Sequence, residues 1–134
     1  MARVILDTGV LIGAVLGRLD LPDLIAQDDV ALPALALTEY LAGVDRDPDE
    51  SRRAAQREFL EAVLATTPVA DYTAKTVPHH AELLGHTRRT GRPRGPIDLI
   101  IAATARATDR LLLTTDGKAG FDELPGVRAR ILPA

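Results

Sequence analysis

Short apolar runs that alternate with longer helix-like runs constrain the fold of this chain more than any other feature. Five of them have the length and composition of buried strands. They cover residues 3–7 (RVILD), 29–33 (DVALP), 68–72 (PVADY), 110–115 (RLLLTT) and, more weakly, 128–132 (RARIL). Strands separated by helices predict a parallel sheet that is flanked by helices on both faces. We therefore expect an α/β fold, built as one domain over residues 1–134.

The segments between these runs carry helical patterns and helix-end signals. Helices are predicted from residue 8 to about 16, over 21–27, from about 34 to 44, from about 50 to 65, from about 73 to 90, and around Asp98 within GPIDLIIAATA. Asp49 or Ser51 would cap the fourth of these helices. Pro96 suits the first position of the last one.

Composition excludes several classes of protein. Hydrophobic residues make up 46% of the chain and charged residues 26%, as in an ordinary globular protein. With no cysteine, neither a disulfide framework nor a thiolate metal site can form. Asp7 interrupts the apolar N-terminal run, and no run of about 18 apolar residues exists, so we expect a cytoplasmic protein without a membrane span. The net charge of −3 argues mildly against a nucleic-acid binder.

Four acidic residues stand alone in apolar surroundings. Asp7 and Asp116 end predicted strands, Glu39 lies inside a predicted helix, and Asp98 lies in the first turn of another. Burying an unpaired carboxylate is costly, so each position needs a reason. The carboxyl ends of parallel strands share one edge of the sheet, where ligands bind in such folds. We expect the four carboxylates to converge there.

Converging carboxylates repel one another unless a cation compensates their charge. Mg²⁺ or Mn²⁺ prefers oxygen ligands and is typically held by one or two carboxylates together with water and substrate phosphate. Such a site supports hydrolysis of phosphodiester bonds. The three histidines, His79, His80 and His86, are not placed as ligands of one ion.

Each acid also has a structural interpretation. Asp7 could cap a helix, Asp98 could accept from the backbone at a helix start, and Asp116 before Gly117 could be a turn acid. Glu39 resists such an interpretation best, because an acid in mid-helix has no capping role. The four together are hard to explain without a shared ligand.

A basic segment lies directly before Asp98. The stretch HTRRTGRPRGP contains Arg88, Arg89, Arg92 and Arg94 and no acid. Taken alone, it is typical of a solvated loop. Beside an acidic centre, these arginines could bind phosphates of a nucleic acid.

These motifs resemble the PIN-domain ribonucleases, specifically the VapC-type toxins of bacterial toxin–antitoxin pairs. VILDTGVLI is similar to the opening strand and its Asp-Thr/Ser-Ser/Asn motif, and LALTEYLAG to the helix that carries the second acid. GPIDLIIAATA resembles the third acid and the run after it, and LLLTTDGKAGFDELPGVR the closing strand with its Thr-x-Asn/Asp turn. The resemblance assigns metal-binding and catalytic roles to Asp7, Glu39, Asp98 and Asp116. It also places Thr8 and either Thr114 or Thr115 at the site.

Two positions depart from the family pattern. Gly9 stands where the family usually has Ser or Asn, so a hydroxyl or amide contact is missing. Many relatives have an acid a few residues after the Asn/Asp, where this chain has Lys118, Ala119 and Gly120. The next acid, Asp122, is a less favoured substitute for Asp116.

The resemblance implies an endoribonuclease that depends on Mg²⁺ or Mn²⁺ and cuts structured RNA, notably tRNA or ribosomal RNA loops. It also implies a homodimer and a cognate antitoxin, whose C-terminal segment would fill the acidic groove.

Three alternatives remain. A catalytically inactive PIN-like module that binds metal or RNA is favoured by Gly9 alone. The Asp7-Thr8-Gly9 triplet also matches aspartic proteases, in which two aspartates share a proton across a dimer axis, but that fold is almost entirely β. A phosphoacceptor signalling domain would need a second acid beside Asp7, which is absent.

Overall fold

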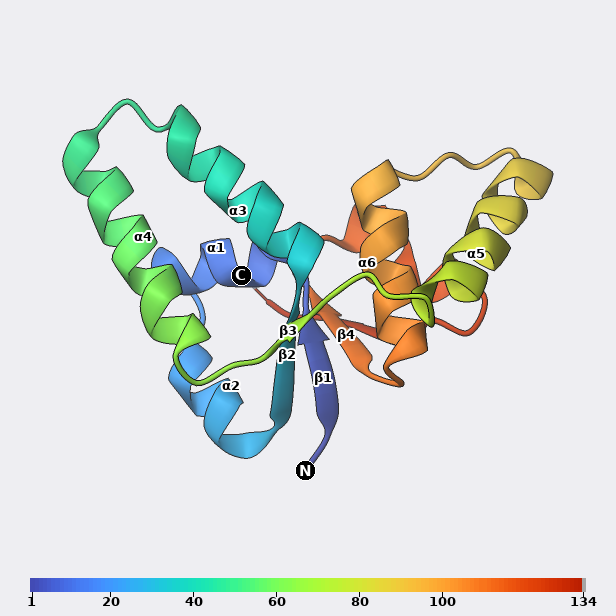
Figure 1. The fold of residues 1–134 in the computed structure, drawn as a ribbon, viewed down its shortest axis with the longest axis horizontal. Helices are drawn as coiled ribbons and strands as arrows, with labels where there is room; N and C mark the ends of the chain where they lie inside the picture. The colour runs from blue at the N-terminus through green and yellow to red at the C-terminus, as the bar shows by residue number, and fades with distance from the viewer. Residues whose placement is uncertain (134) are drawn as a thin grey trace.

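Five parallel strands form the centre of the fold in the computed structural model, which describes residues 1–133 (Figure 1). They are β1 (Arg3–Leu6), β2 (Asp29–Pro33), β3 (Val69–Ala70), β4 (Leu111–Thr114) and β5 (Ala129–Ile131), arranged in the order β3-β2-β1-β4-β5. Every neighbouring pair is parallel. The predicted parallel α/β fold is confirmed. β2 has the predicted bounds, whereas the other strands are shorter than expected, and β3 keeps only two residues of PVADY.

Six α-helices and two short 3-10 helices connect the strands. They are α1 (Thr8–Val15), α2 (Leu21–Gln27), α3 (Ala34–Arg46), α4 (Glu50–Leu64), α5 (Thr76–Thr90), α6 (Pro96–Ala107), η1 (Gly117–Ala119) and η2 (Phe121–Glu123). Asp49, rather than Ser51, caps α4 by accepting from the Arg52 N–H at 2.9 Å. The two 3-10 helices were not predicted from the sequence.

The start of α5 differs from the prediction by one turn. The Thr73 N–H donates to the Thr76 hydroxyl at 3.1 Å, so residues 73–75 form a turn before the helix. Pro78 lies in the first turn of α5, where its missing N–H needs no partner inside the helix.

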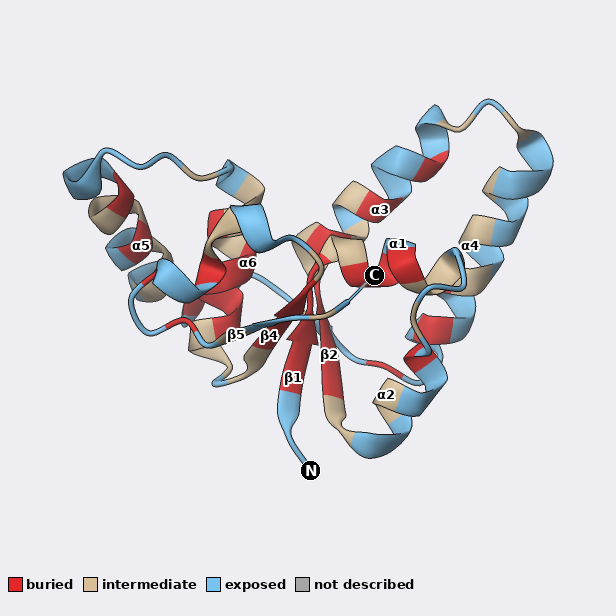
Figure 2. Cartoon of the chain, turned by 180° about the vertical axis from the view of Figure 1, so that it is seen from behind, coloured by how far each residue is buried: buried red, intermediate tan, exposed pale blue. Residues whose placement is uncertain are grey.

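Two hydrophobic layers cover the two faces of the sheet (Figure 2). Side chains alternate along β1, so Ile5 packs with α5 and α6 on one face while Val4 and Leu6 pack with α1 to α4 on the other. All three are fully buried. Burial on both faces explains why the strands read as continuous apolar runs rather than as alternating ones.

Two pairs of helices form arms on either side of the carboxyl edge of the sheet. Figure 1 shows the α3–α4 hairpin on one side of this edge and the α5–α6 pair on the other. The basic segment runs from the last turn of α5, which carries Arg88 and Arg89, through the connection to α6. This connection lies at the same edge of the sheet as the start of α6 (Figure 1).

This architecture tests the aspartic protease alternative and the expectation that no helix spans a membrane. The parallel sheet and its helices contradict the aspartic protease alternative, because that fold is almost entirely β. Among the helices in residues 1–133, none combines the length and the apolar character that crossing a bilayer requires.

Candidate active site

The structure places the four isolated acids around the carboxyl edge of the sheet. Asp7 directly follows β1 and Asp116 lies two residues beyond β4, the neighbour of β1. Glu39 lies in the middle of α3, and Asp98 in the first turn of α6. The charges of the other three acids all act on Asp98, and those of Glu39 and Asp116 act on Asp7. The predicted convergence is therefore present in the fold.

Asp7 is the most buried of the four, with 7% of its surface exposed. Its Oδ1 accepts from the Thr8 N–H at 2.8 Å, and its Oδ2 accepts from the Thr114 hydroxyl at 2.9 Å. Burial raises the pKa of Asp7, these two hydrogen bonds partly oppose the rise, and the charges of Glu39 and Asp116 add to it. Asp7 thus caps α1, as its structural interpretation predicts, while also facing the acidic cluster.

Thr8 links two of the acids. Its backbone N–H donates to Asp7, and its hydroxyl donates to Oε1 of Glu39 at 2.8 Å. One residue at the start of α1 therefore orients carboxylates that come from β1 and from α3. This contact fixes Glu39 as a hydrogen-bond acceptor at the site and gives Thr8 a positioning role.

Asp98 shows the strongest electrostatic conflict at the site. Burial raises its pKa to about 6, and the negative charges of Asp7, Glu39 and Asp116 contribute to the rise. No hydrogen bond to its carboxylate opposes this shift within residues 1–133. Gly95 makes room for it, since a Cβ there would lie 3.2 Å from Oδ2 of Asp98. The simple helix-start interpretation therefore leaves the charge of Asp98 uncompensated.

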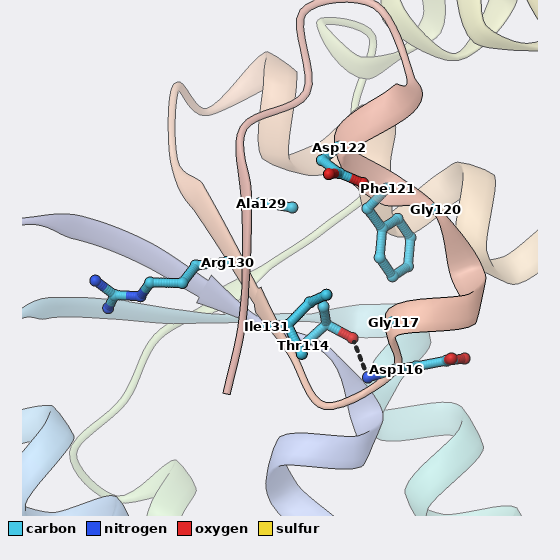
Figure 3. Close-up of a pocket in the computed structure, with 9 residues that line it drawn as sticks. All are labelled: Thr114, Asp116, Gly117, Gly120, Phe121, Asp122, Ala129, Arg130 and Ile131. Carbon is cyan, nitrogen blue, oxygen red and sulfur yellow. Dashed lines mark hydrogen bonds between the residues drawn. The ribbon is translucent and has the colours of Figure 1, made fainter. Parts of the chain in front are cut away.

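Asp116 is exposed at the rim of the site and caps η1. Its Oδ1 accepts from the N–H groups of Lys118 at 2.9 Å and Ala119 at 3.3 Å, so the turn interpretation also holds. Its own N–H donates to the Thr114 hydroxyl at 3.0 Å (Figure 3). Both Asp116 and Asp122 line a pocket of about 270 Å³. Only Asp116 is among the charges that shift the pKa values of Asp7 and Asp98, which favours it over Asp122 as the fourth acid.

The donor set suits a hard divalent cation. All four groups are carboxylates, and the charges of the other three add to the effect of burial in raising the pKa of Asp98. In residues 1–133, however, no group of three or more acidic or histidine side chains is close enough together to hold a metal ion by itself. The site therefore fits an ion such as Mg²⁺, which is commonly held by one or two carboxylates and keeps several waters, better than an ion enclosed by protein.

Thr114 joins the strand end to the acids and was named in the sequence only through the resemblance, as one of two threonines. It is 1% exposed, and its hydroxyl both donates to Asp7 and accepts from the Asp116 N–H. No local sequence signal distinguishes it from Thr115; what distinguishes it is its place as the last residue of β4, with a buried side chain. The structure thus shows that Thr114, and not Thr115, makes the hydrogen bonds to Asp7 and Asp116.

Replacing Thr114 with Val should destabilise the protein. The change keeps the shape but leaves a buried carboxylate oxygen and a backbone N–H without their partner, which costs about 1–3 kcal/mol. Loss of the hydrogen bond should also raise the pKa of Asp7 further. Urea unfolding at pH 7 measures the first effect, with Thr38→Val as the control, because Thr38 is exposed on α3 and bonds only within its own helix. Equal stabilities of the two variants would contradict the role given to Thr114.

The arginines of the basic segment divide into two groups. Arg88, Arg89 and Arg92 are exposed, and Arg92 lies 3.7 Å from Glu123. Arg94 has only 13% of its side chain exposed and is bound to Glu123 at 3.2 Å. Its guanidinium also donates to the Gly120 carbonyl at 3.5 Å. Arg94 therefore ties the basic segment to η2, which conflicts with its expected availability for phosphate.

Comparison with known proteins gives one consistent result. Residues 4–127 match the model of the PIN domain family. The chain is 28% identical over 102 residues to the tRNA(fMet)-specific endonuclease VapC of Shigella flexneri, which covers 76% of this chain and 74% of that protein. It is 26% identical over 129 residues to ribonuclease VapC of Rickettsia bellii, across 96% of each chain. VapBC-5 of Mycobacterium tuberculosis, a member of the VapBC family of toxin–antitoxin systems, superposes over the full length of both chains with a TM-score of 0.77 and 28% identity.

Proposed function

Because this chain belongs to the PIN domain family, we propose that it is a VapC-type toxin, a metal-dependent endoribonuclease whose activity a cognate antitoxin restrains. The observation that carries the proposal is the convergence of four carboxylates from β1, α3, α6 and the β4–η1 turn, with the pKa of Asp98 raised to about 6. A site with this excess of negative charge is built for a cation and not for direct contact with RNA phosphate.

Mg²⁺ or Mn²⁺ would be held by Asp7, Glu39, Asp98 and Asp116, by one or two of them directly and by the others through the waters that the ion keeps. The bound ion supplies Lewis acidity toward a phosphoryl oxygen and lowers the pKa of water. The chain contributes the geometry. Thr114 and the Thr8 N–H fix the Asp7 carboxylate, and the Thr8 hydroxyl fixes Glu39. Water attack would leave a 5′-phosphate on one product.

The substrate we propose is structured RNA, in particular tRNA or ribosomal RNA loops. A named relative acts on tRNA(fMet), which supports this class of substrate. Arg88 and Arg89 lie in the last turn of α5 and Arg92 lies in the connection to α6, and all three would bind phosphates of the RNA. The acids alone would repel RNA, so the exposed arginines complement them.

The partners we propose are an antitoxin and a second copy of the chain. Solved relatives are toxin–antitoxin complexes, which supports the first. The acidic edge between the two arms would accept a basic side chain, such as an arginine in the C-terminal segment of the antitoxin. The homodimer rests on the family resemblance.

Cleavage of a structured RNA pool by the purified protein tests the proposed function. We expect cutting with Mg²⁺ or Mn²⁺, none with EDTA, and a loss of about a hundredfold or more in Glu39→Gln, because an acid of the site becomes neutral. Asp116→Asn should lose activity similarly, whereas Asp122→Asn should keep it. Circular dichroism and unfolding curves establish that each variant is folded.

The possible outcomes separate the alternatives. Metal-dependent cutting that is lost in Glu39→Gln supports the ribonuclease. Metal binding measured by calorimetry without any cutting across tRNA and ribosomal RNA would instead show the catalytically inactive module. Equal cutting by wild type and Glu39→Gln would place the activity elsewhere or in a contaminant. Loss in Asp122→Asn with retention in Asp116→Asn would exchange their roles.

A further inference from the structure

Two adjacent threonines at the end of β4, Thr114 as its last residue and Thr115 after it, differ in the hydrogen bonds that their hydroxyls make. Thr114 is buried, and its hydroxyl is committed to Asp7 and to the Asp116 N–H. Thr115 is partly exposed, and its hydroxyl has no hydrogen-bond partner in the protein among residues 1–133. The Thr115 hydroxyl is therefore available to donate a hydrogen bond, and Thr115 precedes Asp116 in the chain.

The Thr115 hydroxyl fills the space that a side chain at position 9 would need. A Cβ built on Gly9 would lie 2.3 Å from Oγ1 of Thr115, far inside contact distance, and 3.7 Å from its Cβ, which is an ordinary contact. Gly9 is in the first turn of α1, two residues after Asp7. A side chain at position 9 and the hydroxyl of Thr115 in its present position thus exclude each other.

This close approach places the hydroxyl beside the first turn of α1, which Asp7 caps. On the α1 side it is next to the turn that begins at Asp7, and on the β4 side its neighbour in the chain is Asp116. Each acid of the cluster, when ionised, can only accept hydrogen bonds. A bound phosphate group is also an acceptor, so its oxygens need donors. The Thr115 hydroxyl is a neutral donor that no protein acceptor in the described part of the chain occupies, between the capped start of α1 and Asp116.

We propose that the Thr115 hydroxyl donates a hydrogen bond to a phosphate oxygen of the bound RNA, and that Gly9 makes this possible by leaving its Cβ position empty. The inference rests on the proposed ribonuclease function. It also explains the departure at position 9. The hydroxyl that the α1 turn lacks is supplied from the end of β4, so Gly9 does not mark an inactive site.

Thr115→Val tests the hydroxyl with little change of shape, because both side chains are β-branched. We expect kcat to fall about tenfold to a hundredfold, at or below the lower end of the range for loss of one preorganised donor, while Thr115→Ser stays within about threefold of wild type. The apo unfolding temperature of Thr115→Val should stay close to that of wild type. Its Mn²⁺ affinity, measured by calorimetry, should also be unchanged, because the hydroxyl is assigned to the substrate and not to the metal.

Position 9 supplies the matched series. Gly9→Ala should displace the hydroxyl, lower kcat to the level of Thr115→Val and reduce the unfolding temperature. In the Thr115→Ala background, Gly9→Ala should be nearly neutral for stability, since the crowded atom is gone. Gly9→Ser combined with Thr115→Ala moves a hydroxyl to the α1 side, and we expect it to recover most of the activity that Thr115→Ala loses.

Wild-type activity in Thr115→Val would overturn this inference and leave the proposed function intact. A fall in Mn²⁺ affinity as large as the fall in kcat would also overturn it, because Thr115 would then act through the metal site. If the wild type does not cut RNA at all, the proposed function fails and the inference fails with it. Equal effects of Gly9→Ala on stability with Thr or Ala at position 115 would overturn the packing on which the inference depends.

Discussion

Asp98→Asn is expected to reduce RNA cleavage about a thousandfold or more and, in the same molecule, to stabilise the metal-free protein at pH 7. The loss follows from removing a carboxylate charge from the proposed cation site, where several kcal/mol of transition-state stabilisation are at stake and each 1.36 kcal/mol is tenfold in rate. The gain follows from removing a carboxylate whose ionised form is disfavoured by burial and by three neighbouring acids. Activity and stability should thus move in opposite directions.

The raised pKa of Asp98 determines whether its contribution to the stability of the metal-free protein rises or falls with pH. Asp98 has an ordinary pKa of 3.8 and a folded pKa of about 6, so the folded state binds more protons between these values. Stability contributed by this group is therefore full below about pH 4, falls as pH rises, and is lost above about pH 6. Because Asp98 is only half-buried, solvent screening reduces the expected penalty at pH 7 to about 1 kcal/mol. The raised pKa of Asp7 acts in the same direction.

Urea unfolding of the metal-free proteins at pH 4 and pH 7 measures this effect. The difference in stability between wild type and Asp98→Asn should be small at pH 4 and larger at pH 7. Mg²⁺ should raise the stability of wild type and have little effect on the variant, since binding to the native state stabilises it. Asp122→Asn, which removes an exposed acid of the same region, is the control and should behave as wild type. A variant less stable than wild type at pH 7 would show that Asp98 is compensated in the fold.

Replacing Arg88, Arg89 and Arg92 together with Ala is expected to weaken RNA binding at least tenfold at low salt and to flatten its salt dependence. Each phosphate contact contributes about 0.7 to the slope of log K against log salt for a single strand, so three lost contacts should reduce the slope by about 2. Binding is measured by fluorescence anisotropy in the Asp98→Asn background, in which the RNA stays intact.

Arg94 and Arg128 supply the comparisons. Arg128 is exposed and precedes β5, so it lies at the amino edge of the sheet, away from the acids, and Arg128→Ala should leave the slope unchanged. Arg94→Ala should chiefly lower stability, because its largely buried guanidinium holds Glu123 and the Gly120 carbonyl. An unchanged slope in the triple variant would remove the basic segment from RNA binding.

The sequence predicted the strands, the helices and the four acids because each leaves a local mark. Doubly buried strands are continuous apolar runs, and an acid inside such a run is visible without any structure. The shortness of β3 leaves no such mark, since only Val69 and Ala70 pair with β2 and this depends on a neighbour distant in sequence.

The contacts between elements could not be predicted. That Thr8 bridges Asp7 and Glu39, that Thr114 rather than Thr115 is buried, and that Gly9 faces the Thr115 hydroxyl all depend on how α1 meets the ends of β1 and β4. Arg94 was grouped with its neighbours because composition cannot distinguish an arginine that contacts solvent from one held by Glu123. Local pattern reveals which residues are unusual, and tertiary packing decides what each one touches.

The acids differ in how many hydrogen bonds hold them in the fold, and this affects which mutations can abolish the activity of such a toxin in a growing population. Asp7 caps α1 and binds Thr114, so most substitutions there harm folding together with activity. Asp98 accepts no hydrogen bond that holds the fold within the described chain, and its charge is a burden to it. Cells that escape poisoning through position 98 would therefore retain a folded, abundant and harmless protein. Such a protein could still occupy the antitoxin and so expose any active copies in the same cell.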